Sequence, residues 1–589
     1  MSKMDLDFMF DWVEYSVVVI MLILSLLVGA YYTFLNKQKT YSDYMLGGRT
    51  MGVLPVSMSI VASFISGISI LGLPTEMYLY GSQCMTNNIA NLIIMTVAGV
   101  FYLPVYHKLQ LSSLLEYLEL RFDSNVRFMG TLMYTMASVL HLPAIIYVPG
   151  LAFNQVTGVP LHIITPIISI CCLFYTAFGG VKAVMWSDTI QNMFTLAAVI
   201  FVILIGSWRL GGILEIWRIN EQGSRLEIFN MDPDPFARNT FLTVTIGSAF
   251  FFLTNIVANP GTVQRFLSVP SIKHIRWVLI YSLIGFYIII NLCTFLGFVL
   301  YARYHQCDPV AVGIIKNPSQ MVPLYVMEVA KDYPGLAGLF MSGVMSAALS
   351  TMASYYNATG GMLYKDVMEV FFPTVHHSEA KQFTIIKVII FVLGIISVAM
   401  VFVVEKLGTV LQMSVSLLGA VYGSILSLFT LGIFFPFVNT KGALAGSLTS
   451  LVLSGWIVFN AQYYIMNGKL QFPGKFTSIG GCSNSTLNHF SPRPELVFNY
   501  TGVGSEVLAD NTVPQVYQLS YNYYTVLGTL TGVAVAMVVS LLTQSPDITT
   551  MNPDLFTPFV HRFMPARDGN LKSRPRKDEY VLTNQKELG

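Results

Sequence analysis

The feature that most constrains this chain is a series of about thirteen apolar runs, each roughly 20 residues long, separated by polar connections. A helical run of that length matches the hydrocarbon thickness of a bilayer. The composition agrees, because 54% of the residues are hydrophobic and only 11% are charged. The sequence therefore predicts an all-α polytopic membrane protein and excludes an ordinary soluble globular domain.

The apolar runs define the spans that we expect. In order, they are 12–34, 52–77, 87–105, 128–153, 161–178, 189–208, 241–257, 277–301, 334–356, 385–404, 410–435, 443–464 and 523–542. Most basic residues fall in alternate connections, so the positive-inside rule predicts an outer N-terminus and an inner C-terminus. The long polar loop 467–519 then lies outside and carries glycosylation sequons at Asn484 and Asn499. The net charge of +2 gives no reason to expect nucleic-acid binding.

The six cysteines are too few and too scattered for a disulfide framework. Cys307 and Cys482 fall in polar loops predicted to lie on the same, outer side, which is compatible with a disulfide between them. Sequence spacing alone does not fix that pairing. The other four are in or beside apolar runs, where we expect inert packing residues: Cys84, Cys171, Cys172 and Cys293.

The second span contains an unusual number of helix-weakening residues. The stretch 56–80 is apolar, yet it contains five serines together with Gly67, Gly72 and Pro74. A spanning helix must satisfy its backbone groups internally, so such a stretch is tolerated mainly where the freed backbone lines a cavity. We therefore expect an ion and a substrate to bind beside this stretch.

A second interruption follows about five spans later. The run 241–257 leads into Asn259-Pro260-Gly261 and contains Thr254 and Asn255. Two discontinuous helices around one substrate are typical of inverted-repeat transporters. Kinks and small packing residues are also common in membrane bundles, and the pattern alone does not distinguish the two interpretations.

The stretch 345–359 places polar groups on one helical face. Ala347, Ser350, Thr351 and Ser354 recur every three to four residues. Backbone carbonyls and hydroxyls can together supply about five neutral oxygen ligands to a sodium ion. The alternative, in which the hydroxyls bond back to their own helix, is frequent in membranes. His141 is the clearest histidine within a span, and we interpret it as a hydrogen-bonded packing residue without a metal partner.

The sequence resembles the sodium:solute symporter family, and within it the branch of sodium-coupled monocarboxylate, multivitamin and iodide transporters. The resemblance runs nearly end to end. Its motifs are YSDYMLGGR (41–49), ILGLPTEMYLYG (70–81), IIYVPGLAFNQVTG (145–158), FYTAFGGVKAVMWSDTIQ (174–191), DPDPFARNTF (232–241), TVQRFLS (262–268), CDPVAVG (307–313), LSTMAS (349–354) and LSYNYYTVLGTLTG (519–532).

The resemblance implies about 13 transmembrane helices around a LeuT-type core of five plus five inverted helices. The corresponding parts are an outer segment with the first span and an inner loop (1–50), the ten-helix transport core (51–436), two last spans with a glycosylated loop (437–543) and a cytoplasmic tail (544–589). It also implies sodium-driven alternating access in a plasma membrane. Its partners would be sodium, a small organic anion and the lipid bilayer, while the oligomeric state stays open.

The resemblance further implies one sodium site between the first and eighth core helices. Its ligands would be the carbonyls of Ala62, Ile65 and Ala347 and the hydroxyls of Ser350 and Thr351. In some relatives an aspartate that matches Asp188 helps to bind a second sodium, with hydroxyls that match Ser63 and Ala353. Ala353 has no hydroxyl, so a second sodium at Ser63 and Asp188 stays open. From its sequence position alone, Asp188 could instead cap a helix.

For the substrate, the resemblance implies contacts from the broken helices and the span between them: Ser66, Gly67, Ile68, Tyr147, Phe252 and Asn255. Since these segments contain no Arg or Lys, we expect dipoles to hold the substrate carboxylate. Iodide is disfavoured, because the iodide transporter has Gln where this chain has Ser69, and a monocarboxylate and a vitamin carboxylate such as biotin or pantothenate remain open. A transport-inactive sensor or channel on the same fold is the alternative, and no motif for an enzyme is present.

Overall fold

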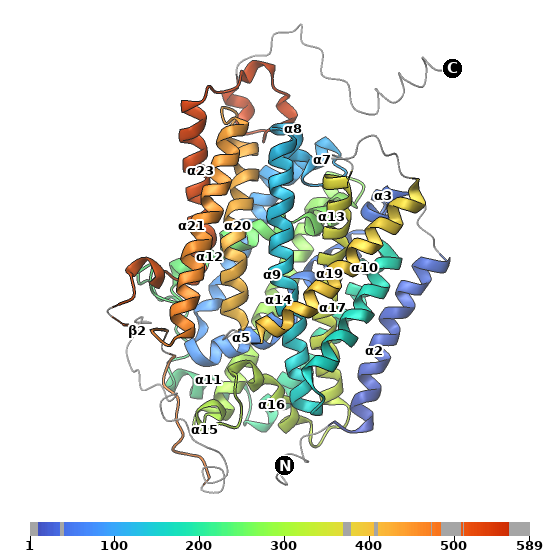
Figure 1. Cartoon of the computed structure of the whole chain (residues 1–589). Helices are drawn as coiled ribbons and strands as arrows, with labels where there is room; N and C mark the ends of the chain where they lie inside the picture. Colours follow the sequence, from blue (N-terminus) through green and yellow to red (C-terminus); the bar gives the residue numbers. More distant parts are fainter. Residues whose placement is uncertain are drawn as a thin grey trace.

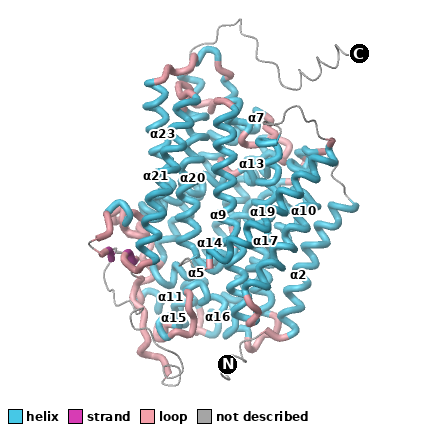
Figure 2. The backbone as a smooth tube through the Cα atoms, in the orientation of Figure 1, coloured by secondary structure: helices cyan, strands magenta, loops and turns pink. Residues whose placement is uncertain are grey.

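The protein is a bundle of long helices, as a computed structural model shows (Figures 1 and 2). The structure describes residues 10–35, 40–368, 378–405, 410–472, 474–483, 508–510 and 512–564. Within these residues, ten helices are long and apolar enough to cross a membrane, or twelve if each of two bent helix pairs is one span. The all-α polytopic prediction is confirmed, whereas the count of thirteen stays a prediction.

The long helices follow the predicted runs closely. They are α2 (Trp12–Ala30), α6 (Asn87–Val97) continued through a π-turn by α7 (Leu103–Leu109), α9 (Ser124–Thr157), α10 (Leu161–Arg209), α14 (Ile272–Tyr304), α17 (Leu336–Leu363), α19 (Glu379–Val404), α20 (Val410–Phe434), α21 (Thr440–Met466) and α23 (Tyr524–Leu542). The bent pairs are α4 (Val53–Phe64) with α5 (Gly67–Tyr80), and α12 (Phe241–Val257) with α13 (Pro260–Leu267).

The shorter elements lie at the ends of the bundle. They are α3 (Tyr41–Leu46), α8 (Glu116–Arg121), α11 (Ile213–Gln222), α15 (Pro309–Val312) and α16 (Met321–Ala330), with an antiparallel pair of two-residue strands, β1 (Leu470–Gln471) and β2 (Leu508–Ala509).

Helix α10 covers two predicted spans, 161–178 and 189–208, and the predicted inner loop between them is helical. A 49-residue helix would be about 73 Å long, more than twice the hydrocarbon thickness. Its backbone changes direction at Gly180, which has φ 61° and ψ −168°, a conformation that only glycine adopts readily. The length and the kink are those of two crossings joined at this glycine.

The centre of the bundle is α17, which is buried along almost its whole length and packs against α10, α9, α2 and α4. Helices α20, α21 and α23 pack on one another at one side, shown at the left of Figure 1. The two bent pairs meet α17, because both α4 and α13 contact it. The interrupted helices and the hydroxyl-rich helix are therefore neighbours.

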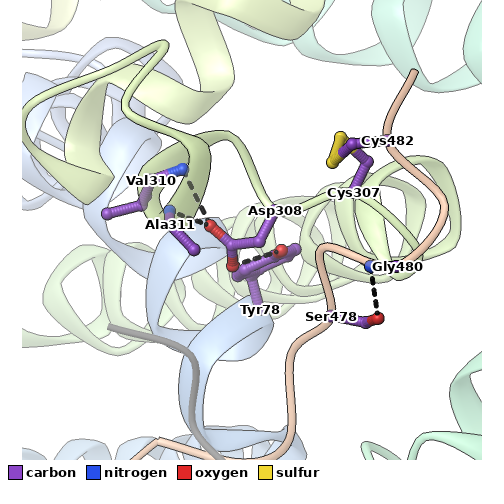
Figure 3. The surroundings of a disulfide bond; sticks show 8 residues. All are labelled: Tyr78, Cys307, Asp308, Val310, Ala311, Ser478, Gly480 and Cys482. Atoms are coloured by element: carbon purple, nitrogen blue, oxygen red, sulfur yellow. Dashed lines mark hydrogen bonds between the residues drawn. A yellow bond between two sulfur atoms is a disulfide. The ribbon is translucent and has the colours of Figure 1, made fainter. Parts of the chain in front are cut away.

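A disulfide joins Cys307 and Cys482 beside α15 (Figure 3). Next to it, Asp308 caps α15 and accepts a 2.8 Å hydrogen bond from the hydroxyl of Tyr78 at the end of α5. The backbone amide of Asp308 donates to the carbonyl of Ser478, so segment 474–483 is held against the end of the bundle. Asn484 and Asn499 lie outside the described residues.

The start of the first long helix and the end of the last lie at different ends of the bundle. Helix α2 begins at the end where α15 and α16 lie, and α23 finishes at the opposite end (Figure 1). This arrangement matches an odd number of crossings between the first and last spans. Which end faces the outside stays a prediction.

Candidate sodium and substrate sites

The first predicted interruption is a true break between α4 and α5. Helix α4 ends at Phe64, Ile65 leaves the helical region with φ −92° and ψ 86°, and Ser66 is extended with ψ 169°. The axes of α4 and α5 differ by 57°. The last carbonyls of a helix have no partner within it, so the break frees the backbone oxygens of Ala62 and Ser63 for other ligands.

Helix α17 presents its hydroxyls to this break. The Thr351 hydroxyl lies 3.2 Å from the carbonyl oxygen of Ser63 and 2.9 Å from that of Ala347. The Ser350 hydroxyl is fully buried and has no hydrogen-bond partner among the described residues. Thr351 therefore bonds back to its own helix and also reaches across to α4. A compact group of buried oxygens from two helices is the kind of donor set that fits a sodium ion.

Asp188 belongs to a buried ion pair. Its Oδ2 accepts hydrogen bonds from the hydroxyl of Ser59 at 2.6 Å and from the guanidinium of Arg265 at 3.1 Å. Both ionic side chains are almost completely excluded from solvent. Asp188 lies within α10, eight residues after Gly180, so it does not cap a helix, and the capping interpretation is wrong because the expected loop is helical.

The same arginine links Asp188 to the break. Arg265 also donates to the hydroxyls of Ser59 and Ser354, and Ser354 lies 2.9 Å from the Ser63 hydroxyl. Ser63 and Asp188, the pair considered for a second sodium, are thus connected through Arg265 and two serines. Ala353 contributes no hydroxyl, but its neighbour Ser354 places one at this point.

A cavity of about 200 Å³ opens beside the break. Of the predicted substrate residues, Ser66, Ile68, Phe252 and Asn255 line it. Gly67 and Tyr147 are not among the lining residues. Gly67 faces α9 and α17 instead, where a Cβ would meet Pro149, Val148 and Val344. Tyr147 is buried elsewhere on α9.

The cavity wall contains polar groups that sequence reasoning missed. The Tyr134 hydroxyl donates to Asn259 at 3.0 Å. The lining residue Tyr355 shares a 2.8 Å hydrogen bond with the hydroxyl of Tyr422, which does not itself line the cavity, and Tyr422 donates to Asn255 at 3.2 Å. The residues come from α9, α12, α17 and α20 and from the junction before α13, so the wall forms only in the folded bundle.

Two further lining residues change the expected chemistry. Arg265 of α13 lines the cavity, so the expectation of a cavity wall without a cation is not met. The segment 260–267 was predicted to be part of an inner loop, but it forms a wholly buried helix, which Asn259 caps. His141 also lines the cavity, and its Nδ1 has no hydrogen-bond partner among the described residues. It is therefore not the hydrogen-bonded packing residue that we predicted.

The end of the cavity away from the break is marked by a second buried ion pair. Glu76 lines the cavity about 15 Å along α5 from Ser66 and is bound by both Nε and Nη2 of Arg238, at 2.9 and 3.0 Å. Asn239 donates to the same carboxylate at 2.8 Å. The guanidinium of Arg238 lies over the ring of Tyr80 at 4.1 Å. The sequence offered no local signal for this pairing.

Comparisons with known proteins identify the architecture. The profile of the sodium:solute symporter family matches residues 44–450. The solved structure of a Na⁺-coupled sialic acid symporter superimposes with a TM-score of 0.73 at 22% identity, covering 91% of this chain and 99% of that one. A nucleobase-cation-symport-1 family transporter gives a TM-score of 0.51 at 12% identity over 86% and 96% of the two chains. The fold is therefore the LeuT-type inverted repeat.

Curated relatives agree over nearly the whole length. Sodium-coupled monocarboxylate transporter 2 from Homo sapiens is 34% identical over 93% of this chain and 87% of that protein. Sodium-coupled monocarboxylate transporter 1 from Homo sapiens is 35% identical over 90% of this chain and 87% of that protein. The sodium-dependent multivitamin transporter from Oryctolagus cuniculus is 32% identical over 94% and 86%. These proteins are sodium-coupled transporters and not enzymes, and this chain belongs to the sodium:solute symporter family.

Proposed function

We propose that this symporter imports a small organic anion, a monocarboxylate or a vitamin carboxylate such as biotin or pantothenate, driven by an inward sodium gradient. The observation that carries the proposal is the contact of the Thr351 hydroxyl with the freed carbonyl of Ser63, directly beside the cavity. An ion held there would lie one helical turn from the substrate-lining residues. The names of the curated relatives support the same class of substrate.

In this proposal the sodium ion binds where α4 ends and α17 passes. Its ligands are the carbonyls of Ala62, Ile65 and Ala347 and the hydroxyls of Ser350 and Thr351. Neutral oxygens suit a hard monovalent cation without requiring a buried carboxylate as a direct ligand. Ser63 and Asp188 are the residues proposed for a second sodium. There, the positive charge of Arg265 already balances the carboxylate, so the ratio of sodium to substrate must be measured.

The substrate is proposed to bind against Ser66, Ile68, Phe252 and Asn255. Phe252 supplies an apolar surface for the carbon chain. The Asn255 amide supplies a donor at the opposite side of the broken helices. Gly67 shapes the break through its close packing against α9 and α17, and Tyr147 would act only through a rearrangement of α9, because neither residue lines the cavity.

We further propose a plasma-membrane location with the N-terminus outside and the C-terminus inside. Asn484 and Asn499 would then carry glycans on the outer loop. The proposed parts are the N-terminal segment and first span (1–50), the ten-helix core (51–436), the last two spans (437–543) and the tail (544–589).

The test is uptake by purified protein in proteoliposomes. Labelled lactate, pyruvate, biotin and pantothenate are offered with an inward sodium gradient, and the matched control replaces external sodium by potassium. We expect accumulation of at least one anion that requires sodium and collapses with a sodium ionophore. Equal uptake in potassium would refute sodium coupling. Sodium-dependent current without uptake of any anion would favour the sensor or channel alternative.

A further inference from the structure

Beside Tyr134 and Tyr355, the His141 side chain lines the cavity and has no hydrogen-bond partner for its Nδ1 among the described residues. His141 lies on α9 seven residues after Tyr134, so the two side chains are about 20° apart around the helix and face the same side. Tyr147, six residues further, is about 120° away around the helix, on a different side from His141, in agreement with its absence from the cavity lining. The imidazole of His141 packs edge-on against the Tyr355 ring at 5.3 Å.

The neighbours of His141 are already satisfied. Tyr134 is bonded to Asn259, and Tyr355 to Tyr422. The ionic groups that line the cavity are paired as well, Arg265 with Asp188 and Glu76 with Arg238. None of these groups is hydrogen-bonded to the imidazole, and Nδ1 of His141 is buried without a partner among the described residues.

A buried ring nitrogen without a partner is costly and therefore uncommon in folded proteins. A neutral imidazole has one N–H donor and one acceptor, and the hydrogen bond made by one nitrogen decides which nitrogen carries the proton. Because no group among the described residues bonds to Nδ1, which is itself closed to solvent, a ligand that reaches Nε2 from the cavity can fix the tautomer. An oxygen acceptor on that ligand would select the form whose N–H points toward it.

We propose that His141 is a substrate-binding residue that selects for a carboxylate, by donating a ring N–H to one of its oxygens. The inference rests on the proposed import of an organic anion and adds the group that recognises its charged end. Phe64 and Phe252 line the same cavity and present rings to each other at 6.3 Å, so an apolar surface is available for the carbon chain. The occupant that fits is a carboxylate with an apolar body.

The first experiment separates binding from folding. His141→Leu removes the donor, His141→Gln keeps an N–H donor, and His162→Leu is the matched control, because His162 is exposed and stacks on Phe402 away from the cavity. Uptake of the anion that wild-type protein carries is measured against anion and against sodium. We expect His141→Leu to raise the anion KM about tenfold or more, since a hydrogen bond to a charged group is lost. His141→Gln should recover most of the affinity.

In the same assay the half-saturating sodium concentration at saturating anion should stay within about twofold for all three variants. An unchanged anion KM in His141→Leu would overturn the inference. An equal rise of the anion KM in His141→Leu and His141→Gln would also overturn it. Absence of sodium-driven uptake by wild-type protein would refute the proposed function instead, so the two failures are distinguishable.

The second measurement uses wild-type protein and does not depend on any variant folding. Diethyl pyrocarbonate acylates a histidine ring nitrogen, and mass spectrometry reports its rate at His141 and at His162. In sodium, the transported carboxylate should slow modification of His141 but not of His162. The neutral amide analogue of that carboxylate, at the same concentration, should not slow modification of His141. Equal protection by the carboxylate and by the amide would show that the ligand merely covers the ring, and would refute selection for the carboxylate.

Discussion

The buried pair of Glu76 and Arg238 gives the sharpest prediction for stability. Arg238 makes two hydrogen bonds to the carboxylate, and its third nitrogen donates to Gln412 of α20 at 2.7 Å. Glu76 is 6% exposed and Arg238 2%. The pair thus joins α5, the start of α12 and α20 at the end of the cavity away from the break.

Arg238→Met removes the positive charge and every donor, and leaves the Glu76 carboxylate with Asn239 alone. Breaking a buried pair in this way costs about 3–5 kcal/mol, because the remaining charge is buried and uncompensated. Removing both charges in Glu76→Gln/Arg238→Met eliminates that penalty. We therefore expect the double variant to be more stable than Arg238→Met, with a coupling energy of about 2–3 kcal/mol.

The assay is the thermal unfolding midpoint of purified protein in one fixed detergent and lipid mixture, followed by tryptophan fluorescence. We expect the unfolding midpoint to be highest for wild type, lower for the double variant and lowest for Arg238→Met. Arg209→Met is the matched control: Arg209 pairs with the largely exposed Asp332, and an exposed pair contributes at most about 1 kcal/mol. A double variant that unfolds at or below the midpoint of Arg238→Met would refute the reasoning, because the losses would then be additive.

Three further predictions concern the ion site, the disulfide and the outer loop. Thr351→Ala should raise the half-saturating sodium concentration for uptake about tenfold or more, whereas Thr351→Ser, which keeps the hydroxyl, should have a value near that of wild type. If the sodium dependence of uptake by Thr351→Ala matched that of wild type, the ion would bind elsewhere. Cys307→Ala should lower the free energy of unfolding by about 2–4 kcal/mol, and adding Cys482→Ala should lower it little further, because the single and the double variant lose the same disulfide. Additive losses of stability, or thiol labelling of Cys307 in unreduced wild-type protein, would contradict the disulfide. Endoglycosidase should increase the gel mobility of wild-type protein made in eukaryotic cells but not that of Asn484→Gln/Asn499→Gln, and a shift in the variant would locate the glycan elsewhere.

Both helix breaks could be predicted from the sequence, because their causes are local. Proline lacks a backbone donor and starts a helix well, and the preceding Asn259 side chain accepts from the first amides of α13. In the first break, Ser66 and Gly67 follow α4 directly, where serine competes for backbone groups and glycine allows close packing. These signals act within a few residues, and the helices are interrupted beside Ser66 and at Asn259. The other two helix-weakening positions, Gly72 and Pro74, do not interrupt α5, which continues through both.

The buried charges could not be predicted, because their causes are distant in sequence. Arg265 stands in a short, half-polar segment that a hydropathy window assigns to a loop, yet its partner Asp188 comes 77 residues earlier. Arg121 and Arg127, which also contributed to the predicted orientation, are only 6% and 5% exposed. Arg121 donates to the carbonyls of Gly432 in α20 and of Phe435 just after it, and Arg127 binds Asp366. Part of the apparent positive-inside signal therefore consists of structural pairs within the bundle.

The geometry also suggests why ion and substrate would depend on one another. Only Ile65 and Ser66 separate the end of α4 from the start of α5. An ion bound to carbonyls at that end would fix the direction in which α5 leaves. Ser66 at the start of α5 and Ile68 within it line the cavity, and Glu76 lines its end away from the break. A substrate that prefers the same position of α5 is then favoured by sodium. By thermodynamic reciprocity, the substrate increases sodium affinity by the same factor, so coupling requires a shared backbone element and no direct contact between the two ligands.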